Sequence, residues 1–257
     1  MPETPDITVV IPTYKREEVL VSSIKSILKQ SHKNLELIVV DQTMEHTKET
    51  TKELRIISDS RLRMYKIAPP SVTAAKNFAL RLSGAPIILF IDDDVSPNKD
   101  LVKFHLLAYK ENPDVSAVAG RVLQDGFTVS KDVLKFDEFA ISHGGFTSPR
   151  PEFTNAFPGG NCSMKIKAAL AVGGFDTRYY ANAFREENDL SIRMAHAGYR
   201  IYFEPRAELL HLATQSGGSR AKKYEELYDT PMFYRNEIFF TLRVVAKGKR
   251  IEALRRK

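Results

Sequence analysis

The 257-residue sequence contains no tryptophan, a single cysteine and no long apolar run. One cysteine, Cys162, cannot form a disulfide within the chain, which predicts a reducing compartment, the cytoplasm. The longest apolar run, residues 85–91, is far shorter than the roughly 18 residues that a membrane-spanning helix needs. The first residues lack a basic segment followed by an apolar one, so we expect no secretory signal.

The positive charge is concentrated at one end of the chain. The net charge is +6, and residues 243–257 supply all of it with seven basic and one acidic side chain. Since the rest of the chain is balanced, no basic face for nucleic acid is indicated, and we expect no nucleic-acid partner. Two interpretations of the tail stay open. It is either a helix packed on the domain, with Ile238, Leu242 and Val245 on one face, or an interfacial helix drawn to anionic lipid.

Strand and helix patterns alternate over the first part of the chain. Short β-branched apolar runs predict strands at residues 7–11, 35–40, 61–67 and 86–91, and helical spacing predicts a helix after each of them. This alternation predicts a mostly parallel sheet covered by helices on both faces. Ligands of such sheets bind at the carboxyl ends of the strands, where polar residues follow three of these four strands.

The pattern weakens after residue 115 and then returns. Residues 116–123 favour a strand, and the segment up to residue 158 is irregular and rich in glycine, proline and phenylalanine. Such long irregular segments inside compact chains are usually functional or mobile. Residues 159–176 predict a strand, a short helix and a Gly-Gly turn, and residues 186–205 predict a helix that ends at Gly198 and then a strand.

Three consecutive carboxylates, Asp92, Asp93 and Asp94, directly follow the predicted strand at residues 86–91. Like charges this close repel one another unless a positive group lies among them. One aspartate could cap the next helix. That helix begins only near Pro97, however, and a cap needs one aspartate and not three. Because carboxylate oxygens are the ligands that Mg²⁺ and Mn²⁺ prefer, the pattern favours a divalent metal site over a cap.

The order of motifs resembles the nucleotide-sugar glycosyltransferases of family 2, which have the GT-A fold, over about residues 7–219. The segments that resemble the nucleotide-binding half are "VVIPTYKRE", "ILKQSHKNLELIVVDQT", "AAKNFAL" and "FIDDDV". Those that resemble the acceptor-side half are "GGNCSMKIKAALAVGGFD", "EENDLSIRMAHAGYRIYFEP" and "ELLHLATQSGGS". Each is weak alone, and seven in the expected order are specific. The resemblance implies one GT-A domain over residues 1–228, divided into 1–114 and 115–228, and a basic helical tail over 229–257.

The resemblance also implies roles for individual residues. Those implied to bind the nucleotide sugar are Pro12, Thr13, Tyr14, Arg16, Asp41, Lys76, Asn77, Asp92 and Asp93. Within this set, Asp41 would accept a hydrogen bond from a ring N–H, as uracil or thymine offers. Asp94 would bind the metal that bridges the two phosphates, and His211 would be a further ligand or a packed strand histidine. Gly160 and Asn161 would lie on the acceptor side.

Two departures from the family pattern concern acidic residues. The position between the two acids of the DxD motif is Asp93, and alternation in an extended segment predicts that its side chain points away from the metal. Glu186 and Glu187 stand where the family usually has a catalytic Glu-Asp pair, with Glu187 as the base. The alternative is a surface ion pair between Asp189 and Arg193, with both glutamates solvated in the first helical turn.

We therefore expect an inverting, Mn²⁺- or Mg²⁺-dependent glycosyltransferase that uses a UDP- or dTDP-sugar. The expected acceptor is a hydroxyl of a glycan or a lipid-linked glycan in polysaccharide synthesis for the cell envelope. The expected location is the cytoplasm or the cytoplasmic face of the membrane. Nucleotidyl transfer is an alternative, although the loop after the first strand, "PTYKRE", has no glycine. A non-catalytic nucleotide- or membrane-binding module is another.

Overall fold

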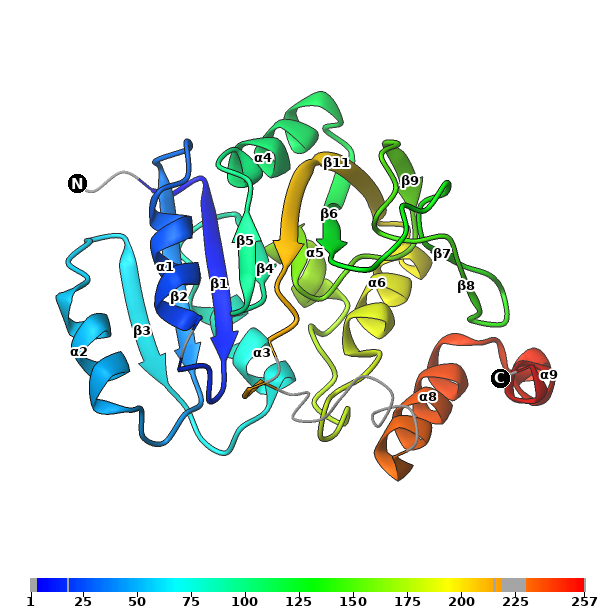
Figure 1. Cartoon of the computed structure of the whole chain (residues 1–257). Helices are drawn as coiled ribbons and strands as arrows, with labels where there is room; N and C mark the ends of the chain where they lie inside the picture. The colour runs from blue at the N-terminus through cyan, green and yellow to red at the C-terminus, as the bar shows by residue number, and fades with distance from the viewer. Residues whose placement is uncertain (1–3, 18, 215, 219–229, 257) are drawn as a thin grey trace.

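A computed structural model describes residues 4–17, 19–214, 216–218 and 230–256 (Figure 1). The elements of the first part are β1 (Ile7–Thr13), α1 (Leu20–Leu28), β2 (Leu35–Asp41), α2 (Lys48–Ile56), β3 (Leu62–Lys66), α3 (Val72–Leu82), β4 (Ile87–Ile91), β5 (Val95–Pro97) and α4 (Leu101–Glu111). Those of the second part are β6 (Val115–Gln124), β7 (Lys135–Phe136), β8 (Ser142–His143), β9 (Glu152–Thr154), β10 (Asn161–Lys165), α5 (Ile166–Ala171), α6 (Glu186–His196), β11 (Arg200–His211), α8 (Pro231–Val244), a short 3-10 turn (Lys247–Lys249) and α9 (Arg250–Arg255).

Nine of the described strands form a central mixed sheet in the order β3-β2-β1-β4-β10-β6-β11-β5, with β9 paired to β11, and β7 and β8 form a separate two-stranded sheet. Strands β1–β4 are parallel to one another, and β6 is parallel to β11. Strand β10 runs antiparallel between β4 and β6 and joins the two parallel parts. The fold is therefore the α/β architecture with a mostly parallel sheet that the alternating pattern predicts.

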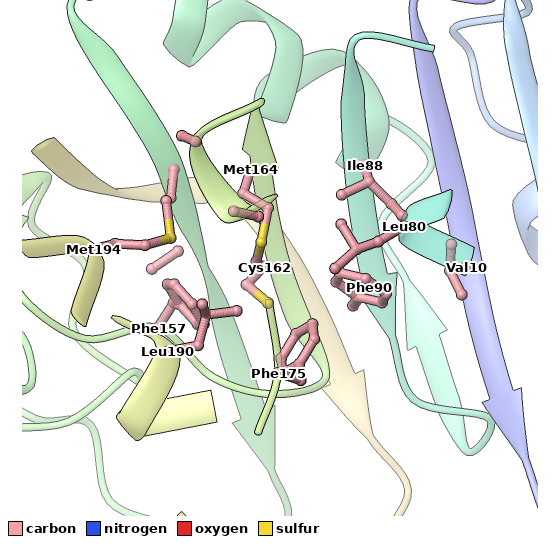
Figure 2. Close-up of a cluster of buried hydrophobic side chains, with 14 of the residues drawn as sticks. Val10, Leu80, Ile88, Phe90, Phe157, Cys162, Met164, Phe175, Leu190 and Met194 are labelled. Carbon is pink, nitrogen blue, oxygen red and sulfur yellow. The ribbon is translucent and has the colours of Figure 1, made fainter. Parts of the chain in front are cut away.

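Each face of the sheet buries its own hydrophobic cluster. Side chains of a strand point alternately to the two faces, so Val10 belongs to one cluster while Val9 and Ile11 belong to the other. Figure 2 shows the first cluster, in which Phe90 of β4 packs beside Cys162 of β10. Cys162 is fully buried there, and burial raises the pKa of its thiol, so it is an inert core residue.

The structure confirms the predicted elements and corrects two details. Helix α4 begins at Leu101, with Asp100 as its N-cap residue, and not near Pro97, which belongs to β5. In the tail, α8 ends at Val244, and Val245 lies buried beyond the helix while Ile238 and Leu242 are exposed. These three residues therefore do not share a helical face.

The tail packs on the second part of the chain (Figure 1). Phe240 and Val244 of α8 share a cluster with Phe136, Tyr179 and Ile192. In the described residues, no helix combines the length and apolar character needed to cross a membrane. The division at residues 114 and 228 stays a prediction, because the second boundary falls among residues 219–229, outside the described part.

A chain of buried hydrogen bonds crosses the sheet beneath the site. The Asn161 amide Nδ2 donates to backbone carbonyls of Arg121 and Ala207, and its Oδ1 lies 2.9 Å from His105 Nε2. His105 Nδ1 lies 2.9 Å from Ser163 Oγ. Since Asn161 Oδ1 only accepts, neutral His105 donates from Nε2 and accepts at Nδ1. Burial lowers the pKa of His105 to about 4, so a proton on Nδ1 would break this chain.

We predict that His105 makes the fold acid-sensitive. Its pKa is about 4 when folded against an ordinary 6.5, so this contribution to stability is complete above pH 6.5 and is lost as the pH falls toward 4. Between pH 7 and 4.5 the wild type should lose on the order of 2–3 kcal/mol more unfolding free energy than His105→Gln. Urea unfolding measures this, with the exposed His196→Gln as control. Equal losses in wild type and His105→Gln would contradict the assignment.

Candidate active site

The ends of three neighbouring strands meet at one edge of the sheet. Strand β1 lies between β2 and β4, and its last residue, Thr13, pairs with Asp41, the last residue of β2. The acidic residues 92–94 follow the end of β4 directly. Pro12 and Tyr14 lie half-buried beside Thr13. The predicted convergence of polar groups at the carboxyl edge is thus present.

Three of the predicted residues form one cluster of metal-binding groups. One ligand atom each from Asp92, Asp94 and His211 lies within 4.8 Å of the others. His211 comes from the far end of the chain because β11 pairs with β5, which sets His211 opposite Val95. Its Nε2 lies 3.4 Å from Asp94 Oδ1, so His211 is not simply a packed strand histidine. Two carboxylates and an imidazole are a donor set that fits a divalent cation.

Gln124, which the sequence did not single out, orients the His211 ring. Its Oε1 lies 2.8 Å from His211 Nδ1, and an amide oxygen can only accept. The Nδ1 atom therefore carries a hydrogen, and Nε2 is the ring nitrogen that faces Asp94 and the cluster. Gln124 stands opposite His211 in the pairing of β6 with β11, a long-range contact that no local spacing reveals.

The positive group among the aspartates is Arg16. Arg16 Nε lies 3.1 Å from Asp93 Oδ1, and Arg16 NH2 lies 3.1 Å from Asp94 Oδ2. Its NH1 donates to the carbonyls of Thr214 and Ser216. The buried guanidinium thus contacts both aspartates and two backbone carbonyls, and it holds the segment after β11 next to the aspartates.

Arg16 also fixes the direction of Asp93. The side chain of Asp93 pairs with Arg16 and is not part of the metal-binding cluster, in line with the predicted alternation. Burial raises the pKa of Asp93 to about 7, against the opposing effect of Arg16. Burial also disfavours the charge on Asp94, but His211 and Arg16 beside it hold its pKa below the ordinary value.

Asp41 is oriented by two neighbours. Its Oδ1 accepts a hydrogen bond from the backbone N–H of Thr43 at 2.8 Å, and its Oδ2 lies 3.0 Å from His46 Nε2. The other ring nitrogen of His46 lies 2.9 Å from Glu17 Oε1. His46 therefore bridges two carboxylates beside the end of β2. A lone histidine in a loop carries no spacing signal, so the sequence does not point to His46.

Lys76 and Glu186 form a buried ion pair. Lys76 Nζ lies 2.5 Å from Glu186 Oε1 and donates to the carbonyl of Gly159, and both side chains are less than 7% exposed. Burial raises the pKa of Glu186 to about 7 although Lys76 opposes the shift. Burial alone would lower the pKa of Lys76, but the charge of Glu186 raises it above the ordinary value. The second carboxylate oxygen of Glu186 is buried without a hydrogen-bond partner.

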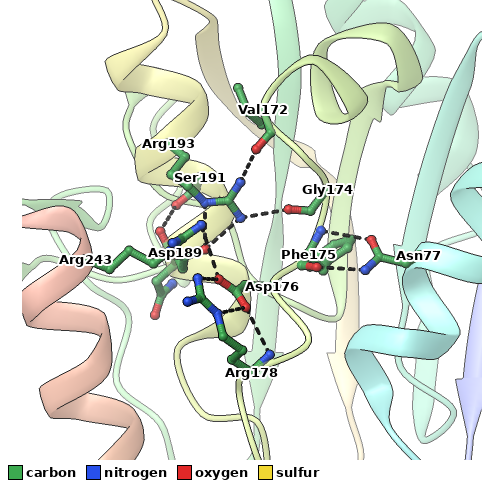
Figure 3. Close-up of polar contacts among 11 residues, drawn as sticks. Asn77, Val172, Gly174, Phe175, Asp176, Arg178, Asp189, Ser191, Arg193 and Arg243 are labelled. Carbon is green, nitrogen blue, oxygen red and sulfur yellow. Dashed lines mark hydrogen bonds and ion pairs between the residues drawn. The ribbon is translucent and has the colours of Figure 1, made fainter.

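Two asparagines implied by the resemblance make contacts within the protein. Asn77 Nδ2 donates to the carbonyl of Phe175, and the Phe175 N–H donates to Asn77 Oδ1, so both polar atoms hold the turn before α6 (Figure 3). Asn161 is fully buried, and its amide belongs to the hydrogen-bond chain with His105. Both asparagines therefore help to fix the backbone around the site.

A cavity of about 730 Å³ opens beside the cluster. Its lining includes six of the predicted residues: Lys76, Asp92, Gly160, Glu186, Glu187 and His211. The irregular region supplies another wall through Gln124, Phe127, Thr128, Phe146 and Thr147. This is the size range of small-molecule sites, with apolar walls and a few convergent polar groups.

The Gly159–Gly160 turn separates Glu187 from Asp92. A Cβ added at Gly159 would lie 3.5 Å from Glu187 Cγ, and one added at Gly160 would overlap the Asp92 carboxylate. The absent side chain at Gly160 thus allows Asp92 to approach the backbone. A carboxylate on each side of the turn faces the same cavity.

Helix α6 begins at Glu186, so both glutamates lie in its first turn. Asp189, in the same turn, is fully buried and pairs with Arg193 and with Arg243 of α8 (Figure 3). The alternative of a surface ion pair beside two solvated glutamates is therefore wrong. Glu186 is buried and Glu187 is half-buried at the cavity wall.

The family model "Glycosyl transferase family 2" matches residues 8–175, which is more than half of the chain. The chain therefore belongs to glycosyl transferase family 2. A curated relative, the glucosyl-dolichyl phosphate glucuronosyltransferase of Haloferax volcanii, is 27% identical over 217 residues. That match covers 80% of this chain and 68% of the relative.

Two solved structures share the fold. One is GalNAc-T7 with UDP, GalNAc and Mn²⁺, with a TM-score of 0.67 and 12% identity, covering 82% of this chain and 44% of that chain. The other is the mannosyltransferase PcManGT from Pyrobaculum calidifontis with GDP-Man and Mn²⁺, with a TM-score of 0.62 and 20% identity. The second match covers 99% of this chain and 75% of that chain. The fold is thus of the GT-A type, as expected, and the chain is a glycosyltransferase.

We predict that Gly160→Ala weakens metal binding. The added methyl group must displace the Asp92 carboxylate, because the atoms that it would overlap are the carboxylate end of that side chain. Displacing one ligand should lower the affinity for Mn²⁺ roughly 10- to 100-fold, which calorimetric titration measures. Gly84→Ala, where the added Cβ meets only ordinary contacts, is the control. Wild-type Mn²⁺ affinity in Gly160→Ala would show that Asp92 is not a ligand.

Proposed function

We propose that the protein is a metal-dependent, inverting glycosyltransferase that moves a sugar from a UDP- or dTDP-sugar to a hydroxyl of a glycan or lipid-linked acceptor. The observation that carries this proposal is one cavity lined by both kinds of group that the reaction needs. Asp92 and His211 of the metal-binding cluster line it, and so does Glu187, the candidate general base.

The metal-binding cluster would serve the leaving group. When bound by Asp94 and His211 with Asp92, a divalent ion, Mn²⁺ or Mg²⁺, would neutralise negative charge on the nucleoside diphosphate. Arg16 keeps Asp93 and Asp94 together by offsetting their mutual repulsion. Both solved structures that share the fold contain Mn²⁺, which supports this class of ion.

Glu187 would act as the general base. An acceptor hydroxyl is a weak nucleophile until its proton is removed, and a positioned carboxylate contributes roughly 10²–10⁴-fold to the rate. The hydroxyl would attack the sugar carbon on the face opposite the diphosphate, and its proton would pass to Glu187. That geometry inverts the anomeric centre. Glu186 and Lys76 would support this step by fixing the first turn of α6 through their ion pair.

The base of the donor would be recognised beside Asp41. Its carboxylate is held by His46 and Thr43, and uracil and thymine present the ring N–H that it could accept from. Pro12, Thr13 and Tyr14 lie next to it at the end of β1. A nucleotidyltransferase would favour a glycine-rich phosphate loop at this position, and the loop here has none.

Exposed apolar and basic side chains of the tail support a lipid-linked acceptor. Tyr234, Ile238 and Leu242 are exposed at intervals of four residues on α8, and Ile251 of α9 is 70% exposed. Lys247 and several arginines lie nearby in the chain. Apolar groups among positive charges suit an anionic membrane surface. The Haloferax relative, whose name includes dolichyl phosphate, is consistent with such an acceptor.

Transfer from a donor panel tests the proposed reaction. We predict transfer from a UDP- or dTDP-sugar with Mn²⁺, and a loss of 10²–10⁴ in kcat for Glu187→Gln with donor affinity retained. Asp94→Asn should instead weaken Mn²⁺-dependent donor binding, which calorimetry measures. A full transfer rate in Glu187→Gln would remove the base assignment. Donor binding without turnover in the wild type, with any acceptor class, would favour the non-catalytic module.

Vesicle flotation tests the membrane surface. The wild type should float with vesicles of phosphatidylglycerol and phosphatidylcholine, and the bound fraction should fall with added salt. Ile238→Ser with Ile251→Ser should lower the bound fraction several-fold because exposed apolar area drives insertion. Met44→Ser, an exposed apolar side chain in the loop after β2, is the control. No flotation at low salt would contradict the proposal.

A further inference from the structure

The segment that leads into α6 has an unusual backbone. Ala181, Ala183 and Arg185 have φ values of 56°, 51° and 76°, in the left-handed region that residues with a Cβ avoid. The same segment lines the cavity through Asn182, Ala183 and Phe184. Such conformations persist where neighbouring structure holds them in place. The neighbour here is α8, which lies outside residues 8–175 matched by the family model.

Asn236 of α8 fixes the start of this segment. It is fully buried, and its Nδ2 donates to the carbonyl of Tyr180 at 2.9 Å. Its Oδ1 accepts from the Tyr180 N–H at 3.3 Å. A side-chain amide that satisfies both backbone groups of one residue replaces the pairing that a strand or helix would supply. Asn236 thus holds Tyr180, the residue directly before the first left-handed position.

Glu237 of α8 fixes the other end of the segment. Arg185 Nε lies 2.7 Å from Glu237 Oε2, and both side chains are mostly buried. The Arg185 guanidinium also lies over the rings of Phe184 and Phe240, 4.8 and 5.2 Å from their centroids. Arg185 is the N-cap residue of α6 and directly precedes the two glutamates. Its position therefore sets where the first turn of α6 begins.

Arg243 of α8 holds the far side of that turn. Its Nε lies 2.8 Å from Asp189 Oδ1, and its NH2 lies 3.2 Å from Asp176 Oδ2 (Figure 3). Asp189 is fully buried, so this pairing is shielded from solvent. Two residues that form ion pairs with α8 thus flank Glu187 in the sequence. Arg185 lies two residues before it, and Asp189 lies two residues after it.

We propose that α8 is a positioning element of the active site: Asn236, Glu237 and Arg243 hold the first turn of α6 so that Glu187 faces the acceptor hydroxyl. This role rests on the proposed function, in which Glu187 is the base. A displacement of about 1 Å at a reacting group can cost roughly 100-fold in rate. The nucleotide-binding strand ends are held by contacts among residues 13–46, 92–94 and 211–216, which lie outside α8, so loosening α8 leaves donor binding intact.

Kinetics of Glu237→Gln and Arg243→Met test the role. We expect kcat for transfer to fall tenfold or more, with the Kd for the UDP-sugar and Mn²⁺ within twofold of wild type. Arg243→Lys, which keeps the charge, should recover most of the rate. Glu252→Gln neutralises an exposed glutamate of α9 and should leave kcat unchanged. Equal losses in kcat and in donor affinity would mean that α8 only stabilises the fold, and unchanged kcat would overturn the proposal.

Amide hydrogen exchange separates this proposal from the proposed function. In Glu237→Gln, exchange at residues 181–189 should accelerate, and exchange at residues 13–17 and 41–46 should not change. If the wild type transfers no sugar from any donor, the proposed function fails by itself, and exchange still decides whether α8 holds the turn. Wild-type exchange at residues 181–189 in both Glu237→Gln and Arg243→Met would overturn the positioning role.

Discussion

The site depends on keeping several carboxylates together at the end of β4 without a large electrostatic cost. Arg16 pairs with Asp93 and Asp94, and His211, the last residue of β11, lies beside Asp94. These contacts connect the first strand, the fourth strand and the segment after residue 211. The arrangement leaves Asp92, Asp94 and His211 directed at one point, where a divalent cation would offset their remaining charge.

Periodicity and strand ends made much of the fold predictable from the sequence. The alternation of apolar runs with helical spacing reports which face of each element is buried, and it predicted the elements up to residue 111 except the short strand β5. The acidic residues 92–94 were found because three consecutive carboxylates after a strand are unusual, and Glu186 and Glu187 were found only through the resemblance to the family. The strand order and the antiparallel insertion of β10 were not predictable, because pairing across the sheet leaves no local mark.

The direction of individual side chains was less predictable than their neighbourhood. Arg16 and Asn77 lie in the expected segments, yet one binds aspartates and the other holds the backbone of Phe175. Resemblance places a motif in the fold, but burial and available partners decide where each side chain points. His46 and Gln124 were missed because each acts through a neighbour brought close only by folding.

The most direct test of the metal-binding cluster is anomalous diffraction from crystals grown with Mn²⁺ and UDP. We expect one strong manganese peak in contact with the Asp94 carboxylate and His211 Nε2, with the diphosphate of UDP on its open side. A manganese peak elsewhere, or bound UDP with no manganese beside Asp94, would contradict the central claim that these residues hold the donor through a divalent ion.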